Sequence, residues 1–488
     1  MQVILYICEI TLHMINYTSQ YQTKIEEFGN LYQMKLNQKN RWIQLGFHLP
    51  WDKLVQIYEK HFSEKGSTAI NPRIVIGSLI IKHKMNLSDE ATVQIIEENP
   101  YMQFFLGLDE FSPFPLFAPT LFVDWRKKLE HETFNKFTDV LIKICFPESF
   151  ETKNVTDSTS DSTSDSTPKN KGKLKLDATV ADQYITYPND LGLLNKAREI
   201  TEKIVDDLYE KLRNQLPQKP RTYRKVARKK FLIESKKRQK NKKTLRSAIR
   251  YMLNCLDRNI GYIHKMLDLL AAQKQKQKQK QKQEHPLTFK QMRQLWIIQT
   301  LNEQQREMYQ KKTNRCDDRI VSISQPHVRP IVRGKAGKKV EFGAKIGLAL
   351  MDGFVKANTL KWDAYNESAD LIPHAKAYKE LYGYYPELIQ VDQIYGTNKN
   401  RTWCKENNIR MTVIPKGKPK TMTAYEKKKK RKETNERNHI EGKIGQAKQG
   451  YRLNSIRAKL SQTSNTWIGI TLFITNLVKF AQLNNFQF

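Results

Sequence analysis

The first part of the chain has the hydrophobic pattern of helices. Apolar residues recur every three or four positions over residues 51–58 and again over residues 72–81, the period of an amphipathic helix. Ser88 and the acidic residues after it are typical of a helix N-cap and first turn. We therefore predict an all-helical domain over residues 42–150, after an N-terminal extension over residues 1–41. Two closely spaced helices here can form a helix-turn-helix that contacts DNA, and ordinary helix packing explains them equally well.

A polar segment separates these helices from a region with a different pattern. Residues 156–167 nearly repeat Asp-Ser-Thr-Ser, which is too polar to pack, so we expect a flexible linker over residues 151–171. Residues 173–181 then alternate with the period of a strand, and Asp352-Gly353 between two apolar runs is a hairpin signal. We expect further strands at residues 319–323, 340–351, 354–360, 387–392 and 409–414, and helices near residues 368–382, 399–407, 435–450 and 464–483.

This alternation of strands and helices predicts an α/β domain over residues 172–484, with a mixed sheet and flanking helices. Residues 194–312 interrupt the alternation with a helical pattern that is rich in Lys and Arg. A Gln-Lys alternation over residues 273–283 is too polar to pack. We therefore expect a basic helical insertion that contains a frayed or disordered tract.

The charge of the chain indicates its partner. The 488 residues include 84 Lys and Arg against 50 Asp and Glu, which gives a formal net charge of +34 spread over most of the chain. Such an excess favours a polyanion, and nucleic acid is the obvious candidate. No stretch reaches the roughly 18 to 20 apolar residues that span a bilayer. Residues 467–480 come nearest, but they include Asn476 and Lys479, so we predict a buried helix and no membrane partner.

Neither the N-terminus nor the cysteines indicate secretion. Residues 1–14 are apolar, but they include Glu9 and lack a basic leader and a small-residue cleavage site. The five cysteines are odd in number and far apart, with no Cys-x-x-Cys spacing. We expect no disulfide framework and no zinc site, and a reducing cytoplasm suits this composition.

Two aspartates stand where predicted strands end. We place Asp177 at the end of the strand predicted from residue 173 onward, and Asp392 at the end of the strand that begins at Glu387. Strand ends are held rigidly and can converge at one edge of a sheet. Taken singly, a strand-terminal aspartate is more often a turn former or a helix cap.

A third carboxylate lies on the helix near residues 436–451. Arg437, Glu441 and Lys448 stand at offsets 0, 4 and 11, which places them within roughly 40° of one another on one helix face. Surface ion pairs are the plain explanation of such a face. The same helix also has Ile440 and Ile444 for a buried face, and glycines that are poor choices for a purely structural helix. The glycines, which would let another backbone such as DNA approach closely, are Gly442, Gly445 and Gly450.

Phosphodiester cleavage needs carboxylates arranged in this way. An attacking water or 3′-hydroxyl must be activated on one side of phosphorus and the leaving oxygen stabilised on the other. Two Mg²⁺ ions roughly 4 Å apart can do both, and Mg²⁺ prefers oxygen ligands. We expect Asp177, Asp392 and Glu441 to hold the ions, while Arg437 and Lys448 grip phosphate oxygens.

Several blocks of this sequence resemble insertion-sequence transposases that carry an acidic DDE triad on a ribonuclease H-like fold. The resemblance extends over about residues 42–483. It implies that Asp177, Asp392 and Glu441 are the catalytic triad and metal ligands, and that two Mg²⁺ (or Mn²⁺) ions are the cofactors. It also implies double-stranded DNA substrates, namely the terminal inverted repeats of the element and target DNA. The blocks are residues 174–184, 325–335, 342–345, 391–397 and 437–448.

The resemblance has one departure. Related transposases carry Tyr, Arg, Glu and Lys at fixed spacing around the glutamate. Arg437, Glu441 and Lys448 match this pattern, but Thr434 stands where the tyrosine would be. We therefore expect no role for a tyrosine at this position in this chain.

Basic and polar residues beside the proposed catalytic elements are expected to bind DNA phosphates. On the helix these are Arg437, Asn438 and Lys448, and in the tract over residues 329–339 they are Arg329, Arg333 and Lys335. Clustered Arg and Lys over residues 221–230 favour a further phosphate contact in the insertion.

The sequence therefore predicts a DNA transposase that cleaves transposon ends and transfers the 3′-hydroxyl strands into target DNA. A ribonuclease H-like endonuclease without joining activity is one alternative. A sequence-specific DNA-binding protein with a decayed catalytic centre is another, although all three acidic residues are present. We expect a homodimer, because two ends must be brought together, and a cytoplasmic, nucleoid-associated location.

Overall fold

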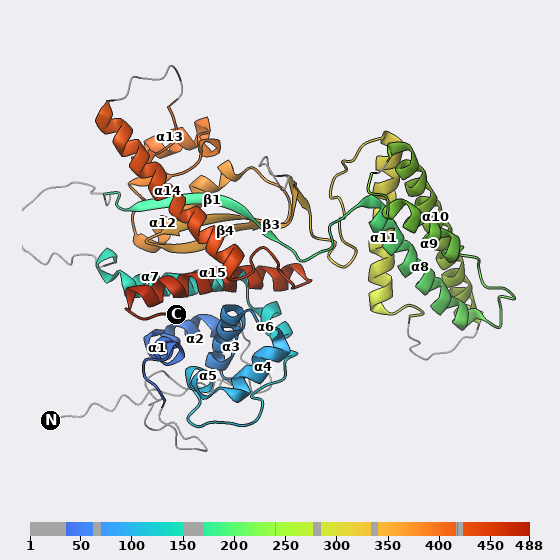
Figure 1. The fold of residues 1–488 in the computed structure, drawn as a ribbon, viewed down its shortest axis with the longest axis horizontal. Coiled ribbons are helices and arrows are strands. Elements are labelled where there is room, and N and C mark those ends of the chain that lie inside the picture. Colours follow the sequence, from blue (N-terminus) through green and yellow to red (C-terminus); the bar gives the residue numbers. More distant parts are fainter. Residues whose placement is uncertain are drawn as a thin grey trace, which may run out of the picture. The chain divides into compact units, whose positions relative to one another are not determined.

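The computed structural model describes residues 36–61, 70–150, 169–239, 241–276, 285–332, 340–415, 417 and 423–488. These residues form a mixed α/β protein (Figure 1) with two compact units. The first unit comprises Met1–Gln183, Lys345–Lys361 and Tyr365–Phe488, and the second comprises Tyr184–Ala344 and Trp362–Ala364. Four expectations lie outside the described residues: most of the N-terminal extension, the Asp-Ser-Thr linker over residues 151–168, residues 277–284 of the Gln-Lys tract, and Arg333 with Lys335.

The N-terminal part of the first unit is helical, as the pattern predicts. Asn71 caps α3, which has Pro72 in its first turn, and Ser88 caps α4 by accepting a hydrogen bond of 3.0 Å from the backbone N–H of Ala91. The helices are α1 (Arg41–His48), α2 (Trp51–Glu59), α3 (Pro72–Met85), α4 (Asp89–Glu98), α5 (Pro100–Phe105), α6 (Leu121–Lys128) and α7 (His131–Cys145), followed by a short 3-10 turn, η2 (Pro147–Ser149).

The sheet has the order β2-β3-β1-β5-β6, and β4 pairs with β3. Strand β1 is parallel to β5, which is parallel to β6, whereas β3 is antiparallel to β2 and to β4. The predicted hairpin at Asp352-Gly353 is confirmed, because Met351 pairs with Phe354. The strands are β1 (Lys173–Asp182), β2 (Pro330–Val332), β3 (Val340–Met351), β4 (Phe354–Lys361), β5 (Leu388–Gln390) and β6 (Arg410–Met411).

The strand expected at residues 319–323 is wrong. This segment has no regular structure, and Ile320 and Ile323 are instead buried in an apolar cluster with the helices of the second unit. An apolar run can therefore be buried without a neighbouring strand to pair with.

Helices follow the later strands, and two long ones end the chain. They are η3 (Glu367–Asp370), α12 (Leu371–Tyr382), η4 (Gln393–Tyr395), α13 (Asn398–Glu406), α14 (Ala424–Gly450) and α15 (Ser461–Leu483). Helix α14 begins eleven residues before the predicted start at residue 435, because a capping box formed by Thr423 and Glu426 closes its first turn.

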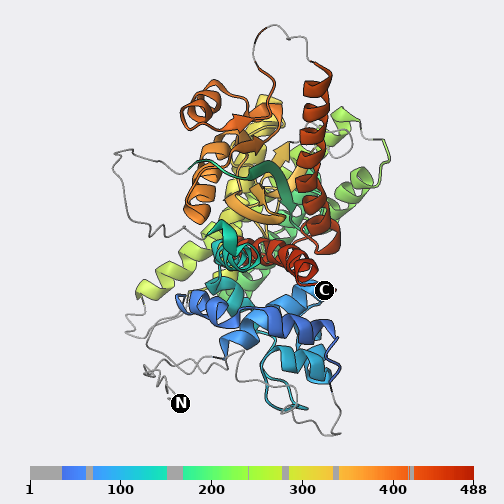
Figure 2. The ribbon, with the colours of Figure 1, turned by 90° about the vertical axis from the view of Figure 1, so that its left-hand side faces the viewer.

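Helix α15 lies in the core, as predicted. Figures 1 and 2 show it beside α7, and the rings of Phe137 and Phe473 have centroids 5.6 Å apart. The side chain of Asn476 bonds both backbone groups of Val355 in β4, accepting from its N–H at 2.8 Å and donating to its carbonyl at 2.7 Å. By length and composition alone α15 is the one helix among the described residues that could span a membrane, but 72% of its most apolar window is buried inside the protein.

The second unit is helical, as the pattern of residues 194–312 predicts, and its described residues form four helices. Two apolar clusters hold these helices together, one around Leu253 and Leu301 and the other around Leu208 and Ile263. The helices are α8 (Asp190–Leu212), α9 (Arg224–Ser235), α10 (Lys242–Lys276) and α11 (Phe289–Lys311).

Candidate active site

The register of the sheet brings the two aspartates together. In the parallel pair, Lys173 of β1 lies opposite Leu388 of β5 and Lys175 lies opposite Gln390. Two residues further along each chain stand Asp177, still within β1, and Asp392, just beyond the end of β5. The two carboxyls are close enough that the charge of Asp392 acts on Asp177.

The prediction that Asp177 ends its strand is wrong. Strand β1 continues to Asp182 because it still has β3 as a neighbour, and only β5 stops, at Gln390. Asp392 therefore stands just beyond a strand end, whereas Asp177 lies inside a strand. The strand backbone on both sides of Asp177 fixes its position more firmly than a turn would.

Asp177 is half-buried beside other charged groups. Its Oδ1 accepts a hydrogen bond of 2.8 Å from the backbone N–H of Ala178. Burial raises the pKa of the Asp177 carboxyl, and the nearby negative charges of Asp392 and Glu367 raise it further, against the lowering effects of the Ala178 hydrogen bond and Arg437. Burial is the largest of these influences, so the raised pKa reflects mainly the loss of water around the Asp177 carboxyl.

Arg437 links the other two predicted carboxylates. Its Nη1 lies 3.1 Å from Oδ1 of Asp392, and its Nη2 lies 3.0 Å from Oε1 of Glu441. The side chain of Arg437 is 17% exposed, whereas those of Asp392 and Glu441 are each 54% exposed. The guanidinium is therefore enclosed and the two carboxylates face outward, where a substrate can reach them.

Polar contacts hold α14 across the sheet. Oε2 of Glu436 lies 2.8 Å from Nζ of Lys173 in β1, and Nε2 of Gln390 in β5 donates to the carbonyl of Glu433 at 3.1 Å. The Glu433 carboxylate also pairs with Arg410 in β6. The hydrogen bond and positive charge of Lys173 lower the pKa of Glu436. These contacts fix the turn of α14 that carries Arg437 and Glu441.

Sequence reasoning missed a fourth acidic residue, Glu367. It opens η3, and its Oε2 lies 3.1 Å from Nζ of Lys345. Its negative charge raises the pKa of Asp177 and of the buried Tyr395, which places it within electrostatic range of the site. A glutamate at the start of a helical segment is common in sequences, so no signal distinguished this one.

The donor chemistry of the site suits Mg²⁺, although the side chains do not converge on one point. Asp177, Asp392 and Glu441 supply only carboxylate oxygens, the ligands that Mg²⁺ prefers. The single Arg437 guanidinium pairs with two of these three carboxylates, so the group keeps negative charge that a cation can balance. Within the described ranges, no three acidic, His or Cys side chains are arranged to hold a metal ion.

The residues predicted to bind phosphate are spread over the chain. Asn438 is exposed on α14 and Lys448 is half-buried in its last turn, whereas Arg329 belongs to the second unit. Nε of Arg329 lies 3.7 Å from Asp318 and 3.6 Å from Asp363, so local carboxylates already surround it.

The three α14 glycines border open space. A Cβ atom added at Gly442, Gly445 or Gly450 would meet nothing within 4 Å. The packing of the described chain therefore does not require these glycines.

Comparison with known families relates both ends of the chain to transposases. Residues 389–478 match the family described as "Transposase DDE domain", and residues 30–128 match "Transposase domain (DUF772)". The first match includes Asp392 and Glu441, while Asp177 lies outside both.

One curated relative is similar over part of the chain. It is the uncharacterized protein ORF8 in the nfe locus of Rhizobium meliloti, 26% identical over 166 residues, which cover 34% of this chain and 72% of the relative. No solved structure matches the chain.

Proposed function

Because matches to two transposase families support an insertion-sequence DDE transposase, we propose that this chain cuts the ends of its element in a Mg²⁺-dependent reaction and joins the freed 3′-hydroxyls to target DNA. Its substrates are then double-stranded DNA, namely the terminal inverted repeats and the target. We also propose that the chain acts as a homodimer that holds two ends of the element. It would act on the nucleoid, in the cytoplasm.

One observation carries the proposal: Arg437 bridges Asp392 and Glu441, and the charge of Asp392 acts on the nearby Asp177 carboxyl. An arginine paired with two half-exposed carboxylates would add little to the stability of a purely structural surface helix. At this position the arginine links a carboxylate just beyond β5 to one on α14, and both lie within the residues that the DDE family match covers.

The strand order supports a ribonuclease H-like catalytic domain. The path β4-β3-β1-β5-β6 combines an antiparallel hairpin with parallel strands, and the triad residues lie on and beside its two central strands. The proposed domain extends over residues 172–484, with the helices of the second unit as an insertion and residues 42–150 as a helical N-terminal domain.

The chain's own residues would do the following work. Mg²⁺ or Mn²⁺ ions held by Asp177, Asp392 and Glu441 would supply Lewis-acid activation of the scissile phosphate and of the attacking oxygen. Arg437 orients Asp392 and Glu441 and can donate to a phosphate oxygen with the same planar fork. Lys173 and Arg410 hold α14 in place through Glu436 and Glu433.

The test uses a labelled duplex that carries the inverted repeats bracketing the reading frame. The full chain is incubated with this duplex and target DNA, with Mg²⁺ or with EDTA, beside the Asp392→Asn variant. Joined products that require both Mg²⁺ and Asp392 support the proposal. Cut products without joining would identify an endonuclease, and retardation without cutting would identify a DNA-binding protein; either result would overturn the joining activity.

A further inference from the structure

A second pocket lies away from the triad, between the N-terminal helices and the segment that follows α14. It encloses a cavity of about 210 Å³. Its walls come from the turn between α3 and α4, from Arg126 of α6, from residues 452–458 and from Trp467 of α15. Nδ2 of Asn86 donates to the carbonyl of Gly450 at 2.9 Å, which joins the two sides of the pocket.

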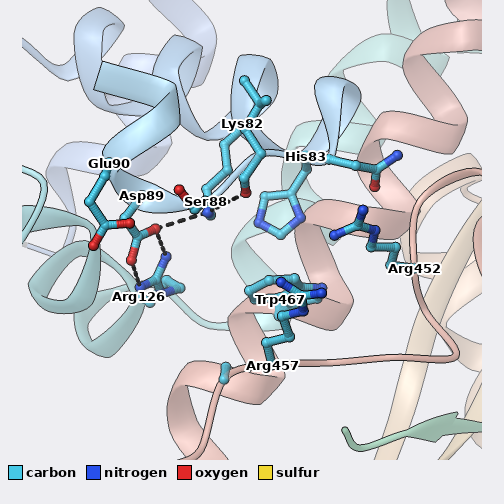
Figure 3. A pocket seen from close by; sticks show the side chains of 12 residues that line it. Lys82, His83, Ser88, Asp89, Glu90, Arg126, Arg452, Arg457 and Trp467 are labelled. Atoms are coloured by element: carbon cyan, nitrogen blue, oxygen red, sulfur yellow. Dashed lines mark hydrogen bonds and ion pairs between the residues drawn. The ribbon is translucent and has the colours of Figure 1, made fainter. Parts of the chain in front are cut away.

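Cations outnumber acidic groups around this cavity. Lys82, Arg126, Arg452 and Arg457 line it, against Asp89 and Glu90. Asp89 is already neutralised, because its carboxylate lies 2.9 Å from Nζ of Lys82 and 2.7 Å from Nη2 of Arg126. In Figure 3, Glu90 lies on the side of Asp89 away from His83 and Arg452. The part of the pocket near Arg452 is therefore positive.

Two buried ring nitrogens in the pocket wall lack hydrogen-bond partners. They are Nε2 of His83 and Nε1 of Trp467, which have no partner among the residues that the structure describes, and the two residues are only 3% and 9% exposed. Their rings are in edge contact, with centroids 4.7 Å apart. An indole N–H can only donate, and a neutral imidazole donates in the tautomer that protonates Nε2. Trp467 therefore needs an acceptor, and His83 needs one in that tautomer.

Arg452 is the cation best placed to complete the site. In Figure 3 its guanidinium lies beside the His83 ring and above Trp467. It forms no ion pair within the described part of the chain, and its backbone is in the left-handed region, at φ 58°. Burial, with the charges of Lys82 and Arg126, lowers the pKa of His83 well below its usual range, so this ring is neutral at physiological pH and carries one N–H.

We infer that this cavity is a binding site for one phosphate group, and that the group is a phosphate of the DNA backbone. The oxygens of a phosphate can accept hydrogen bonds from His83 and Trp467, and its negative charge can balance the surplus of cations. Its assignment to DNA rests on the proposed function. Gly450 lies nine residues after Glu441 on α14, a rise of roughly 14 Å, or about four base-pair steps along a duplex. One strand can therefore extend from the triad to this pocket.

The test measures equilibrium binding of the element-end duplex to the full chain by fluorescence anisotropy, without metal, over a series of salt concentrations. Each lost phosphate contact should lower the slope of log affinity against log salt by about one. We expect this loss for Arg452→Gln, and a weakening of roughly threefold to tenfold for Trp467→Phe, which removes the N–H donor together with part of the indole ring. The matched control is Lys53→Gln, which removes one exposed charge from α2.

A wild-type slope and affinity in Arg452→Gln would overturn the DNA assignment, as would an equal loss in Lys53→Gln. Failure of the proposed function is recognised separately, as a wild-type chain that binds no element-end DNA. In that case the pocket is tested by melting the protein with and without inorganic phosphate. A phosphate-induced rise in the wild-type melting temperature that Arg452→Gln abolishes supports a free-phosphate site. No rise in the wild-type melting temperature would show that the pocket does not bind phosphate.

Discussion

The two long helices at the end of the chain are held by opposite kinds of interaction. Helix α14 has 27 residues, of which only Ile440 and Ala447 are buried among those described. Helix α15 has 23 residues, and 16 of them are buried. Ion pairs with Lys173 and Arg410 hold α14 on the sheet, whereas apolar contacts with α7 and β4 hold α15.

This difference separates the helix that stabilises the fold from the helix that presents charged groups to the proposed active site. Burial of a large apolar side chain contributes several kcal/mol, whereas exposed ion pairs contribute little to folding but fix the orientation of charged groups. Helix α15 therefore stabilises the first unit, and α14 presents Arg437 and Glu441 to the strand aspartates. Substitutions in α15 should change stability, and substitutions in α14 should change activity.

The largest effect is expected in α15. Phe473→Ala removes a side chain that is 1% exposed and contacts the rings of Phe134 and Phe137. We expect a loss of about 3–5 kcal/mol in the free energy of unfolding, measured by urea denaturation. Gln482→Ala, at an exposed position of the same helix, is the control. A loss below about 1 kcal/mol for Phe473→Ala would show that α15 is not a core helix.

The next effect belongs to α14. Glu441→Gln keeps the size of the side chain but removes the charge that pairs with Arg437 and that a divalent ion would need. We expect strand cleavage to fall at least about 10²-fold, while the free energy of unfolding stays within about 0.5 kcal/mol of the wild type. Glu380→Gln, on the exposed side of α12, should keep full activity. Equal activity in both variants would remove Glu441 from the catalytic group.

A smaller effect is expected at Asp177, where one substitution should raise stability and abolish activity. Because the folded state raises the pKa of Asp177, its contribution to stability is present below the unfolded pKa of about 4 and is lost as pH rises through the folded pKa. Asp177→Asn should therefore raise the melting temperature at pH 7 and abolish cleavage, and its advantage should shrink as the pH falls toward 4. Thermal melts of both proteins from pH 4 to pH 8 give this difference. A variant that is less stable at pH 7 would contradict the raised pKa.

The smallest effect is expected for one contact that docks α14. Glu436→Gln weakens the pair with Lys173, whose side chain is 51% exposed, so the loss of stability should be below about 1 kcal/mol. The Glu433 contacts with Gln390 and Arg410 remain, and cleavage should fall less than about tenfold. Parallel melts and cleavage rates check this. A collapse of activity as deep as that of Glu441→Gln would show that this single pair positions the helix.

The local pattern of the sequence was sufficient for most elements. Hydrophobic periodicity predicted the N-terminal helices, the hairpin at Asp352-Gly353 and the burial of α15, because each depends on residues close together in the chain. The same reasoning was wrong at residues 319–323, where apolar residues pack on helices without forming a strand. It also placed Asp177 at a strand end, since the neighbour that extends β1 is distant in sequence.

By itself, the sequence determined which residues could carry the chemistry: two aspartates near strands, a glutamate on a helix and the arginine one turn before it. Only the tertiary structure decided that Arg437 bridges Asp392 and Glu441, that Glu367 stands nearby, and that His83 and Trp467 meet Arg452 around a cavity. Apart from the Arg437–Glu441 pair, these contacts join residues tens to hundreds of positions apart. Strand pairing and helix docking set them, and neither leaves a periodic signal in the chain.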